Sequence, residues 1–409
     1  MSGFEKAFSP ITIGPLTLRN RFIKAATNEG MAKGGIVSKG LARFHERMAE
    51  GGTALSTVAY CATSRDGRTF TDQAVLDADS TADFRVLTDA VHKQGGAASA
   101  QITHAGSFTF LDKDTLQTNK PLSSSGGFNK VGVVSGRFFK KKMDRSEMDA
   151  IAQEFVDAAV LAREAGFDAV ELHMGHGYLL SQFVSPIYNK RRDAYGGTIA
   201  KRMAFPSEIL RRVLDAVGKD LAVIVKYSMT DGPKGNQIAE GKEVARILAA
   251  DGAHMAVLSN GLNVESISAM FGSSLPKSGA KPANPFIRLG MAIQSFTEPP
   301  EVKFRENYLR DLSREVRSAT DMPLAYLGGV QSRDGVVDAM DDGFEAIAMG
   351  RALVHDAAFI NKLQAQSVQT SGCTACNRCV TMMYTPSGTS CIIADNAMDP
   401  KLNVERAAL

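Results

Sequence analysis

The chain lacks long uncharged runs, and it has almost no excess of charge of either sign. No uncharged stretch approaches the ~18 residues needed to cross a bilayer, and the segment from Met1 to Lys6 lacks the basic and apolar parts of a secretory signal. The 47 basic residues nearly balance the 44 acidic ones, which leaves no electrostatic footprint for nucleic acid or an anionic membrane. These absences predict a cytoplasmic protein that acts on a small molecule.

Cysteine is also scarce, and its placement is uneven. Four of the five cysteines are crowded between Cys373 and Cys391. In a reducing compartment this pattern does not indicate a disulfide scaffold, so it favours a metal or cluster site. With 409 residues and 44% hydrophobic content, the chain can bury a large core, either as one large α/β domain or as two smaller ones.

Glycines divide the chain into repeated units. Each follows an amphipathic stretch and precedes an apolar burst, which is typical of a left-handed helix end that turns into a strand. These glycines are Gly52, Gly96, Gly166, Gly252 and Gly343. The bursts give eight candidate strands, at roughly 22–26, 53–59, 97–102, 167–172, 221–227, 254–259, 323–327 and 344–349.

The segments between these strands read as helices that cover a sheet. In the best example, Asp144 and Glu147 stand at capping-box spacing before an apolar face that includes Met148, Ile151 and Phe155. A doubly wound sheet would need an early phosphate fingerprint, but Gly175-His-Gly177 comes late and lacks the third glycine. The pattern therefore predicts an α/β fold, a (β/α)8 TIM barrel with long capping loops.

Two connections are too long to be simple turns, at roughly 103–143 and 260–305. Long loops at the carboxyl ends of barrel strands usually cover the substrate. The second one contains Met270, Phe271, Phe286, Met291 and Phe296. These residues fit an apolar lid and fit equally well packing against the barrel rim.

The densest group of polar side chains follows the fourth strand. His173 emerges at its carboxyl end, which is the catalytic face of TIM barrels. Two motifs continue from there, His176-Gly-Tyr-Leu-Leu-Ser-Gln-Phe-Val-Ser-Pro186 and Asn189-Lys-Arg-Arg-Asp-Ala-Tyr-Gly-Gly197. With Gln101-Ile-Thr-His-Ala-Gly106 and Tyr326-Leu-Gly-Gly-Val330, the chain resembles the old yellow enzyme family of flavin-dependent NAD(P)H oxidoreductases over most of its length.

The resemblance implies a reaction in which hydride passes from NADH or NADPH to FMN and then to the β-carbon of an electron-poor alkene. His173 and His176 are suited to hold the developing enolate oxygen, and Tyr178 matches the proton donor of the family. Taken singly, a loop histidine is usually a satisfied surface group, and a His-x-x-His pair also fits metal binding.

The resemblance also assigns flavin-binding residues. Gln101 matches the residue that pairs with the pyrimidine edge, and Lys226 stands where the family more often has arginine to stabilise the anionic hydroquinone. A structural hydrogen bond and a salt bridge are the plainer roles of these two side chains. The phosphate site is expected after the seventh and eighth strands, at Gly328, Gly329, Gly350 and Arg351, and the flavin is expected to border Ala26, Thr27, Asn28 and Ala59.

Cys373-Thr-Ala-Cys376-Asn-Arg-Cys379 and the later Cys391 supply four thiolates. This spacing suits a [4Fe-4S] cluster, with structural zinc as the second choice and unligated thiols as the third. It is similar to the cysteine motif of trimethylamine dehydrogenase and the dienoyl-CoA reductases, which continue into a second nucleotide-binding region. This chain ends at Leu409, so a cluster here would need a separate redox partner.

The sequence thus predicts an FMN-binding barrel over residues 1–365 and a cysteine-containing extension over residues 366–409. The expected activity is reduction of an enone or related alkene by NAD(P)H. The alternatives are an iron-sulfur flavoprotein dehydrogenase that oxidises its substrate, and a non-catalytic barrel that uses its cysteines for interaction. The sequence is compatible with a homo-oligomer, and it leaves open the physiological alkene and the preference between NADH and NADPH.

Overall fold

A computed structural model describes residues 1–116, 120–276, 301–394 and 399–408, together with four isolated positions between 277 and 300. Phe286, Met291 and Phe296 of the expected lid lie outside the described residues. Within the described part of the chain, no helix is both long and apolar enough to cross a membrane.

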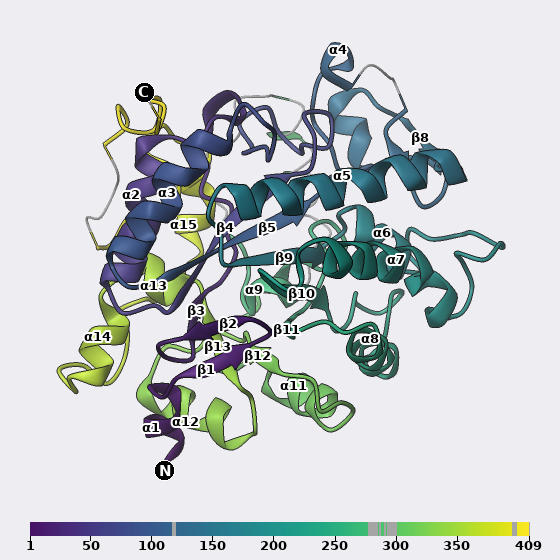
Figure 1. Cartoon of the computed structure of the whole chain (residues 1–409). Coiled ribbons are helices and arrows are strands. Elements are labelled where there is room, and N and C mark those ends of the chain that lie inside the picture. The colour runs from purple at the N-terminus through teal and green to yellow at the C-terminus, as the bar shows by residue number, and fades with distance from the viewer. Residues whose placement is uncertain are drawn as a thin grey trace.

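Eight parallel strands close into a barrel, which confirms the predicted fold class (Figure 1). The strands follow one another around the barrel in chain order, and the last pairs with the first. They are β3 (Phe22–Lys24), β4 (Leu55–Ala62), β5 (Ala97–Thr103), β9 (Ala169–Met174), β10 (Ala222–Ser228), β11 (Met255–Ser259), β12 (Leu324–Tyr326) and β13 (Ala346–Met349). Each lies within a few residues of the segment expected from its apolar burst.

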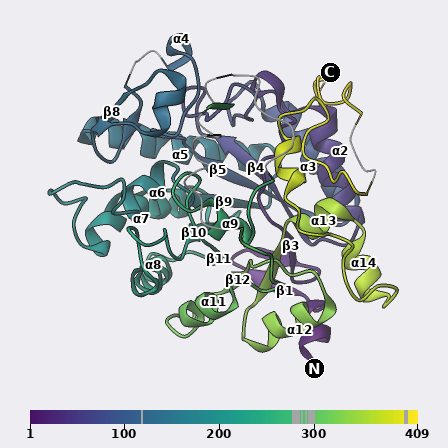
Figure 2. The ribbon, with the colours of Figure 1, turned by 180° about the vertical axis from the view of Figure 1, so that it is seen from behind.

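Helices surround the barrel on the outside (Figures 1 and 2). Among the described residues the larger ones are α2 (Lys39–Glu50), α3 (Thr81–Lys93), α5 (Arg145–Glu164), α7 (Ile199–Val217), α8 (Ile238–Ala250), α11 (Arg310–Arg317) and α12 (Arg333–Asp341). The short helices α13 (Arg351–His355) and α14 (Phe359–Gln364) follow β13. The helices therefore form an outer layer around the barrel strands.

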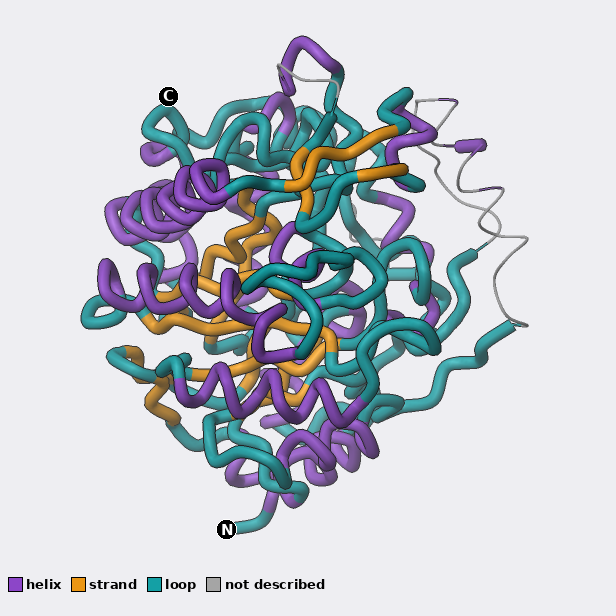
Figure 3. Tube along the Cα trace, turned by 90° about the vertical axis from the view of Figure 1, so that its right-hand side faces the viewer, coloured by secondary structure: helices purple, strands orange, loops and turns teal. Residues whose placement is uncertain are grey.

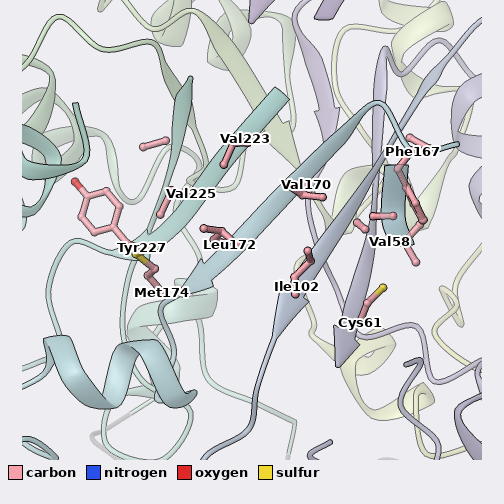
Figure 4. Packing of buried hydrophobic residues seen from close by; sticks show 14 of the residues in the cluster. Val58, Cys61, Ile102, Phe167, Val170, Leu172, Met174, Val223, Val225 and Tyr227 are labelled. Atoms are coloured by element: carbon pink, nitrogen blue, oxygen red, sulfur yellow. The ribbon is translucent and has the colours of Figure 1, made fainter. Parts of the chain in front are cut away.

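The strands are buried on both faces, so two cores form. Val170, Leu172 and Met174 of β9 belong to the outer core between barrel and helices (Figure 4), while Ala169 belongs to the inner core. A hairpin of β1 (Ile11–Ile13) and β2 (Leu16–Leu18) contributes Ile13 and Leu18 to the inner core. The hairpin closes the amino-terminal end, so the opposite end is left for a site.

The glycine pattern is correct at four of the five units. Gly52, Gly166, Gly252 and Gly343 all have positive φ, between 81° and 104°. At the third unit the prediction is wrong by one residue, because Gly95 (φ 67°) makes the left-handed turn in place of Gly96. Helix α3 ends at Lys93 with Gln94 as its C-cap, so the chain must turn at the next residue.

Both long connections lie at the carboxyl end of the barrel. The first forms the helix α4 (Lys113–Leu116) and a small sheet of β6 (Leu122–Ser123), β7 (Gly127–Phe128) and β8 (Phe139–Lys142), which Figure 3 shows beyond the barrel strands. The described part of the second connection forms α9 (Ile267–Phe271).

The last residues of the chain return to the first helices of the barrel. The Ala407 N–H donates to the Val37 carbonyl (2.9 Å), and Arg406 forms an ion pair with the buried Asp83 of α3 (2.7 Å). The C-terminus thus lies beside α2 and α3, far from the N-terminus (Figure 1). The segment also includes α15 (Arg378–Met382). Its separation from the barrel as a unit over residues 366–409 stays a prediction.

The capping box of α5 is formed as the sequence predicts, and it makes a first test. The Asp144 carboxylate accepts from the Glu147 N–H, and the Glu147 carboxylate accepts from the Asp144 N–H, both at 3.0 Å. We expect Asp144→Ala to lower the free energy of unfolding by about 0.5–2 kcal/mol, because it leaves a helix N–H without its partner. Urea unfolding measures this loss. Asp144→Ser keeps an acceptor oxygen and should retain most of the stability; an equal loss in both variants contradicts the capping account.

Candidate active site

A cavity of about 1830 Å³ opens where the barrel strands end. Most of the residues singled out from the sequence line it: Ala26, Thr27, Asn28, Gln101, His173, His176, Tyr178, Lys226, Gly329, Gly350 and Arg351. Cys376 and Cys379 line it as well, whereas Ala59, Gly328, Cys373 and Cys391 are not among its lining residues. The strand order has therefore brought together side chains from positions more than 300 residues apart.

Two histidines form a pair at the end of β9. The ring centroids of His173 and His176 are 4.9 Å apart and the rings are nearly perpendicular (76°). His176 has a left-handed backbone (φ 64°); its N–H donates to Ser228 Oγ, and its Nε2 lies 2.8 Å from Ser259 Oγ. In the described part of the structure, Nδ1 of His173 is buried without a hydrogen-bond partner. A ligand atom is the natural partner for such a group.

The surroundings of both imidazoles disfavour their charged forms. Burial lowers the pKa of His173 well below its usual value, and the neighbouring Lys226 lowers it further. Burial likewise lowers the pKa of His176 well below its usual value, with added contributions from His173 and Lys226. Both rings are consequently neutral at pH 7, and each can donate one N–H.

Tyr178 completes this corner of the cavity. It is the N-cap of α6 (Leu179–Val184), and its ring centroid lies 4.9 Å from His173 and 5.1 Å from Tyr60. Burial raises the pKa of the Tyr178 phenol well above its usual value, and the adjacent Tyr60 raises it further. The hydroxyl therefore retains its proton until an acceptor draws it off.

A buried charged layer lies at the strand ends. Lys226 donates from Nζ to the Ala26 carbonyl (3.3 Å), and Gln101 donates from Nε2 to Glu171 (2.6 Å). Burial lowers the pKa of Lys226, an effect that Glu171 opposes. Sequence reasoning missed Glu171, although a carboxylate inside an apolar strand could have revealed it. Because the amide nitrogen of Gln101 donates to Glu171, the amide oxygen can accept a hydrogen bond from a ligand.

A second buried pair, missed by sequence reasoning, holds the loop after β3. Lys24 and Glu29 form an ion pair with side chains 0% and 1% exposed. Glu29 also accepts from Thr27 Oγ1 (3.0 Å) and from the Ala59 N–H (3.3 Å). This one carboxylate fixes the backbone of residues 25–29 against β4. A lysine within the apolar burst of the first strand was the signal that could have revealed it.

The backbones of Asn28 and Ala59 pair with each other. The Asn28 side chain accepts from the Gly30 N–H (3.0 Å) and so stabilises its own turn. Its backbone forms a parallel bridge with Ala59, which is itself buried behind the cavity wall. The loop therefore presents backbone and the side chains of Ala26, Thr27 and Asn28 to the cavity, and a border with a flavin ring stays a prediction.

The expected phosphate site is open at Gly350 but crowded at Gly329, where an added Cβ would come within 2.7 Å of the Phe304 ring. Gly329 is left-handed (φ 80°), and a Cβ on Gly350 would meet only Thr27, at 3.8 Å, so a ligand can approach the backbone there. Gly328 faces the Tyr326 hydroxyl instead. Among the described residues, His173 Nδ1 and the Gln101 amide oxygen have no hydrogen-bond partner, and with buried Lys226 and the open backbone at Gly350 they fit a flavin nucleotide.

Arg351 lines the cavity, but its guanidinium group is hydrogen-bonded to other groups of the protein. It donates to Asn377 Oδ1 (2.6 Å) and to the Phe271 carbonyl (2.8 Å), and it stacks over Phe304 at 5.0 Å. This side chain joins the end of β13 to the second long connection and to the cysteine segment. Its predicted contact with phosphate stays a prediction, and sequence reasoning missed its bridging role.

Within the described residues, none of the four clustered cysteines is in a disulfide bond. Burial, with a further contribution from Cys373, raises the pKa of Cys379 to about 12. The Cys391 sulfur lies 3.4 Å from Nδ1 of His355. Among the described residues, no three His, Cys, Asp or Glu side chains stand close enough to hold a metal ion. The donor set suits a cluster or zinc by its chemistry, and a metal centre at Cys373, Cys376, Cys379 and Cys391 stays a prediction.

The two neutral imidazoles generate a test of stability against pH. An unfolded histidine gains its proton near pH 6.5, whereas His173 and His176 do so only at much lower pH. Below pH 6.5 the unfolded state binds more protons, so the free energy of unfolding falls as pH falls, by up to about 1.4 kcal/mol per pH unit for each ring. The double variant His173→Asn/His176→Asn should show a shallower fall than the parent in urea titrations. If the free energy of unfolding falls with pH equally in the parent and the double variant, the rings do not stay neutral.

Comparison with known proteins agrees with this site. The model of the NADH:flavin oxidoreductase / NADH oxidase family matches residues 6–275. The chain is 40% identical over 394 residues to 4,4'-dithiodibutanoate disulfide reductase of Rhodococcus erythropolis, with 95% of each chain covered. It is 30% identical over 384 residues to NADH oxidase of Thermoanaerobacter brockii, covering 92% of this chain and 54% of that protein.

Solved structures support the fold. The old yellow enzyme homologue from Zymomonas mobilis superposes with a TM-score of 0.69 at 20% identity, covering 90% of this chain and 94% of that one. A 2-naphthoyl-CoA reductase complex gives a TM-score of 0.79 at 20% identity, covering 98% of this chain and 58% of that one. By its matching family model and by these relatives, the chain belongs to the NADH:flavin oxidoreductase / NADH oxidase family, the old yellow enzyme family that its motifs resemble.

Proposed function

We propose that this protein is an ene-reductase that uses FMN and NAD(P)H to reduce an alkene conjugated to a carbonyl group. Membership of the family implies FMN and a nicotinamide reductant. The observation that carries the finer proposal is the convergence of His173, His176 and Tyr178 in one buried corner of the cavity. The overall reaction consumes one alkene, one NAD(P)H and one proton, and it yields the saturated carbonyl compound and NAD(P)⁺.

When bound, FMN supplies the two-electron carrier that takes hydride from the nicotinamide and delivers it to the acceptor. The residues proposed to hold it are Gln101 at the pyrimidine edge, Lys226 near N1 and O2, and the backbone at Gly329 and Gly350 for the phosphate, with Ala26, Thr27 and Asn28 along the ring. Arg351 lies beside the proposed phosphate site. Lys226 places positive charge where reduction adds negative charge.

His173 and His176 orient the acceptor and stabilise charge on its oxygen. Two neutral rings can each donate one N–H, and donors aimed at the carbonyl oxygen become stronger as that oxygen gains enolate character. Because the site is buried, these hydrogen bonds compete little with water. Tyr178 then supplies a proton to the α-carbon. Its high pKa keeps it protonated beforehand, and the growing basicity of the enolate carbon draws the proton off.

A second candidate acceptor is a small organic disulfide that carries carboxylates. The Rhodococcus erythropolis relative is named for reduction of such a compound and matches this chain over 95% of both lengths. Lys130 and Lys303 line the cavity and could pair with carboxylates at the two ends of the molecule. Hydride delivery to one sulfur would break the S–S bond and release the other sulfur as a thiolate.

The two acceptors differ in their need for a proton donor, which gives a sharp test. We expect Tyr178→Phe to slow alkene reduction by about 10²–10⁴-fold, because a carbon must be protonated in the site. Disulfide reduction should stay close to the parent rate, since a departing thiolate is stable without a proton. Anaerobic stopped-flow spectroscopy measures flavin bleaching by NADPH or NADH and then reoxidation by cyclohexenone or 4,4'-dithiodibutanoate.

The reductive half of that experiment serves as its control. Tyr178→Phe should bleach at the parent rate, which shows that the FMN site is intact. If no enone reoxidises the reduced parent enzyme, the ene-reductase proposal is wrong. If the flavin is reduced by an amine and not by a nicotinamide, the protein is a dehydrogenase. A preparation without bound flavin contradicts all of these readings.

The cysteine segment is proposed to hold a [4Fe-4S] cluster, with zinc as the alternative. Anaerobically purified protein should contain about four iron atoms and four sulfides for each chain if the cluster is present. Cys391→Ser should lower that content, while Cys61→Ser is the matched control, because Cys61 is a fully buried cysteine of β4 and is not one of the four proposed ligands. Zinc without sulfide excludes the cluster. If the cluster is confirmed, we expect it to exchange electrons with a separate redox partner.

A further inference from the structure

A row of three phenylalanines extends from the proton donor along the cavity wall. The Phe108 ring lies edge-on to Tyr178 with centroids 5.5 Å apart, and Phe110 lies edge-on to Phe108 at 5.4 Å. Phe70 is stacked on Phe110 at 5.2 Å with the rings 10° from parallel. All three line the cavity and are only partly buried. We call Phe70, Phe108 and Phe110 the aromatic row.

The backbone that carries this row is firmly held. Residues 107–111 alternate: Ser107, Thr109 and Leu111 are buried in the protein, and the two phenylalanines between them are left facing the cavity. Thr109 Oγ1 donates to the Arg68 carbonyl (2.8 Å), and the Phe110 N–H donates to the Thr69 carbonyl (2.8 Å). These bonds tie the segment of Phe108 and Phe110 to the segment of Phe70, so the rings are positioned before any ligand arrives.

The segment is also fixed to the turn that carries Tyr178 through one buried amide. Gln182 of α6 accepts from the Ser107 N–H (3.2 Å) and donates to the Ala105 carbonyl (3.1 Å), and its side chain is fully buried. Because Gln182 is four residues after Tyr178, the same short helix sets both the proton donor and the start of the row. A flat substituent that extends from the reacting carbon towards the aromatic row would therefore contact rings whose positions are already fixed.

We infer that the aromatic row selects an acceptor whose activated alkene carries an aryl or similarly flat unsaturated substituent. This inference rests on the proposed ene-reductase function and narrows its substrate class. Partly exposed rings leave apolar surface facing the cavity, and a flat substituent would cover that surface and gain edge or stacking contacts. The cavity, at about 1830 Å³, is larger than the 300–1,000 Å³ of an ordinary ligand site, so it has room for such a group beside a flavin.

The test compares two enones that differ in one substituent, 4-phenylbut-3-en-2-one and pent-3-en-2-one, with the FMN-loaded enzyme and saturating NAD(P)H. The parent should show a kcat/KM at least about tenfold higher for the phenyl compound. Phe110→Leu should lower kcat/KM for the phenyl compound by about three- to tenfold and change that for the methyl compound by less than about twofold. Phe70→Leu should act in the same direction, which covers the case in which Phe110→Leu does not fold.

Phe138→Leu is the matched control, since Phe138 is a half-exposed phenylalanine of the same covering connection that does not line the cavity. This variant should leave kcat/KM unchanged for both enones. If the parent reduces both enones equally, or if neither row variant lowers the phenyl preference, the inference is wrong while the ene-reductase function stands. If neither enone reoxidises the flavin, the proposed function itself has failed. A raised KM for NAD(P)H in the row variants, with the phenyl preference unchanged, would assign the row to the nicotinamide and overturn the inference.

Discussion

Exclusion of water at the carboxyl end of the barrel sets the protonation state of the site. Burial keeps His173 and His176 neutral and keeps the proton on Tyr178. The same burial would be unfavourable for Lys226 if Glu171 did not oppose it. A single environment thus keeps two imidazoles neutral and a phenol protonated beside Lys226, whose charged form Glu171 favours. The chemistry proposed for the site depends on this environment more than on any one contact.

The barrel provides the environment because of how its strands end. Inward-facing positions are filled by small and aliphatic residues low in the barrel, such as Ala169 and Ala222, and by polar residues at the top, such as His173 and Lys226. The neighbouring registers place Lys226 directly beside His173 across β9 and β10. Two long connections then cover this end. The polar groups therefore line a cavity in place of joining the packed core, and a ligand can reach them there.

The fold was largely readable from the sequence because each unit repeats the same local signals. The strands, the α5 capping box and most of the helix-ending glycines follow from residues that act on their immediate neighbours. The site was readable where a motif is contiguous, as at His173, His176 and Tyr178. It was not readable where a contact depends on chain closure. The bond from Gln101 to Glu171 and the bridging of Arg351 join segments whose registry only the closed barrel defines. The Lys24–Glu29 pair is local in sequence, but its burial depends on the elements packed around it.

Arg351 shows how such contacts connect the parts of the protein. Its guanidinium group donates to Asn377 and to the Phe271 carbonyl, so it joins the cysteine segment to the second long connection. Asn377 also donates to Ser273 Oγ (2.9 Å), which closes a small network between the same two segments. Cys376 and Cys379 line the cavity on either side of this asparagine. The segment that would hold a metal centre and the loop that covers the proposed flavin site are therefore joined through Arg351 and Asn377.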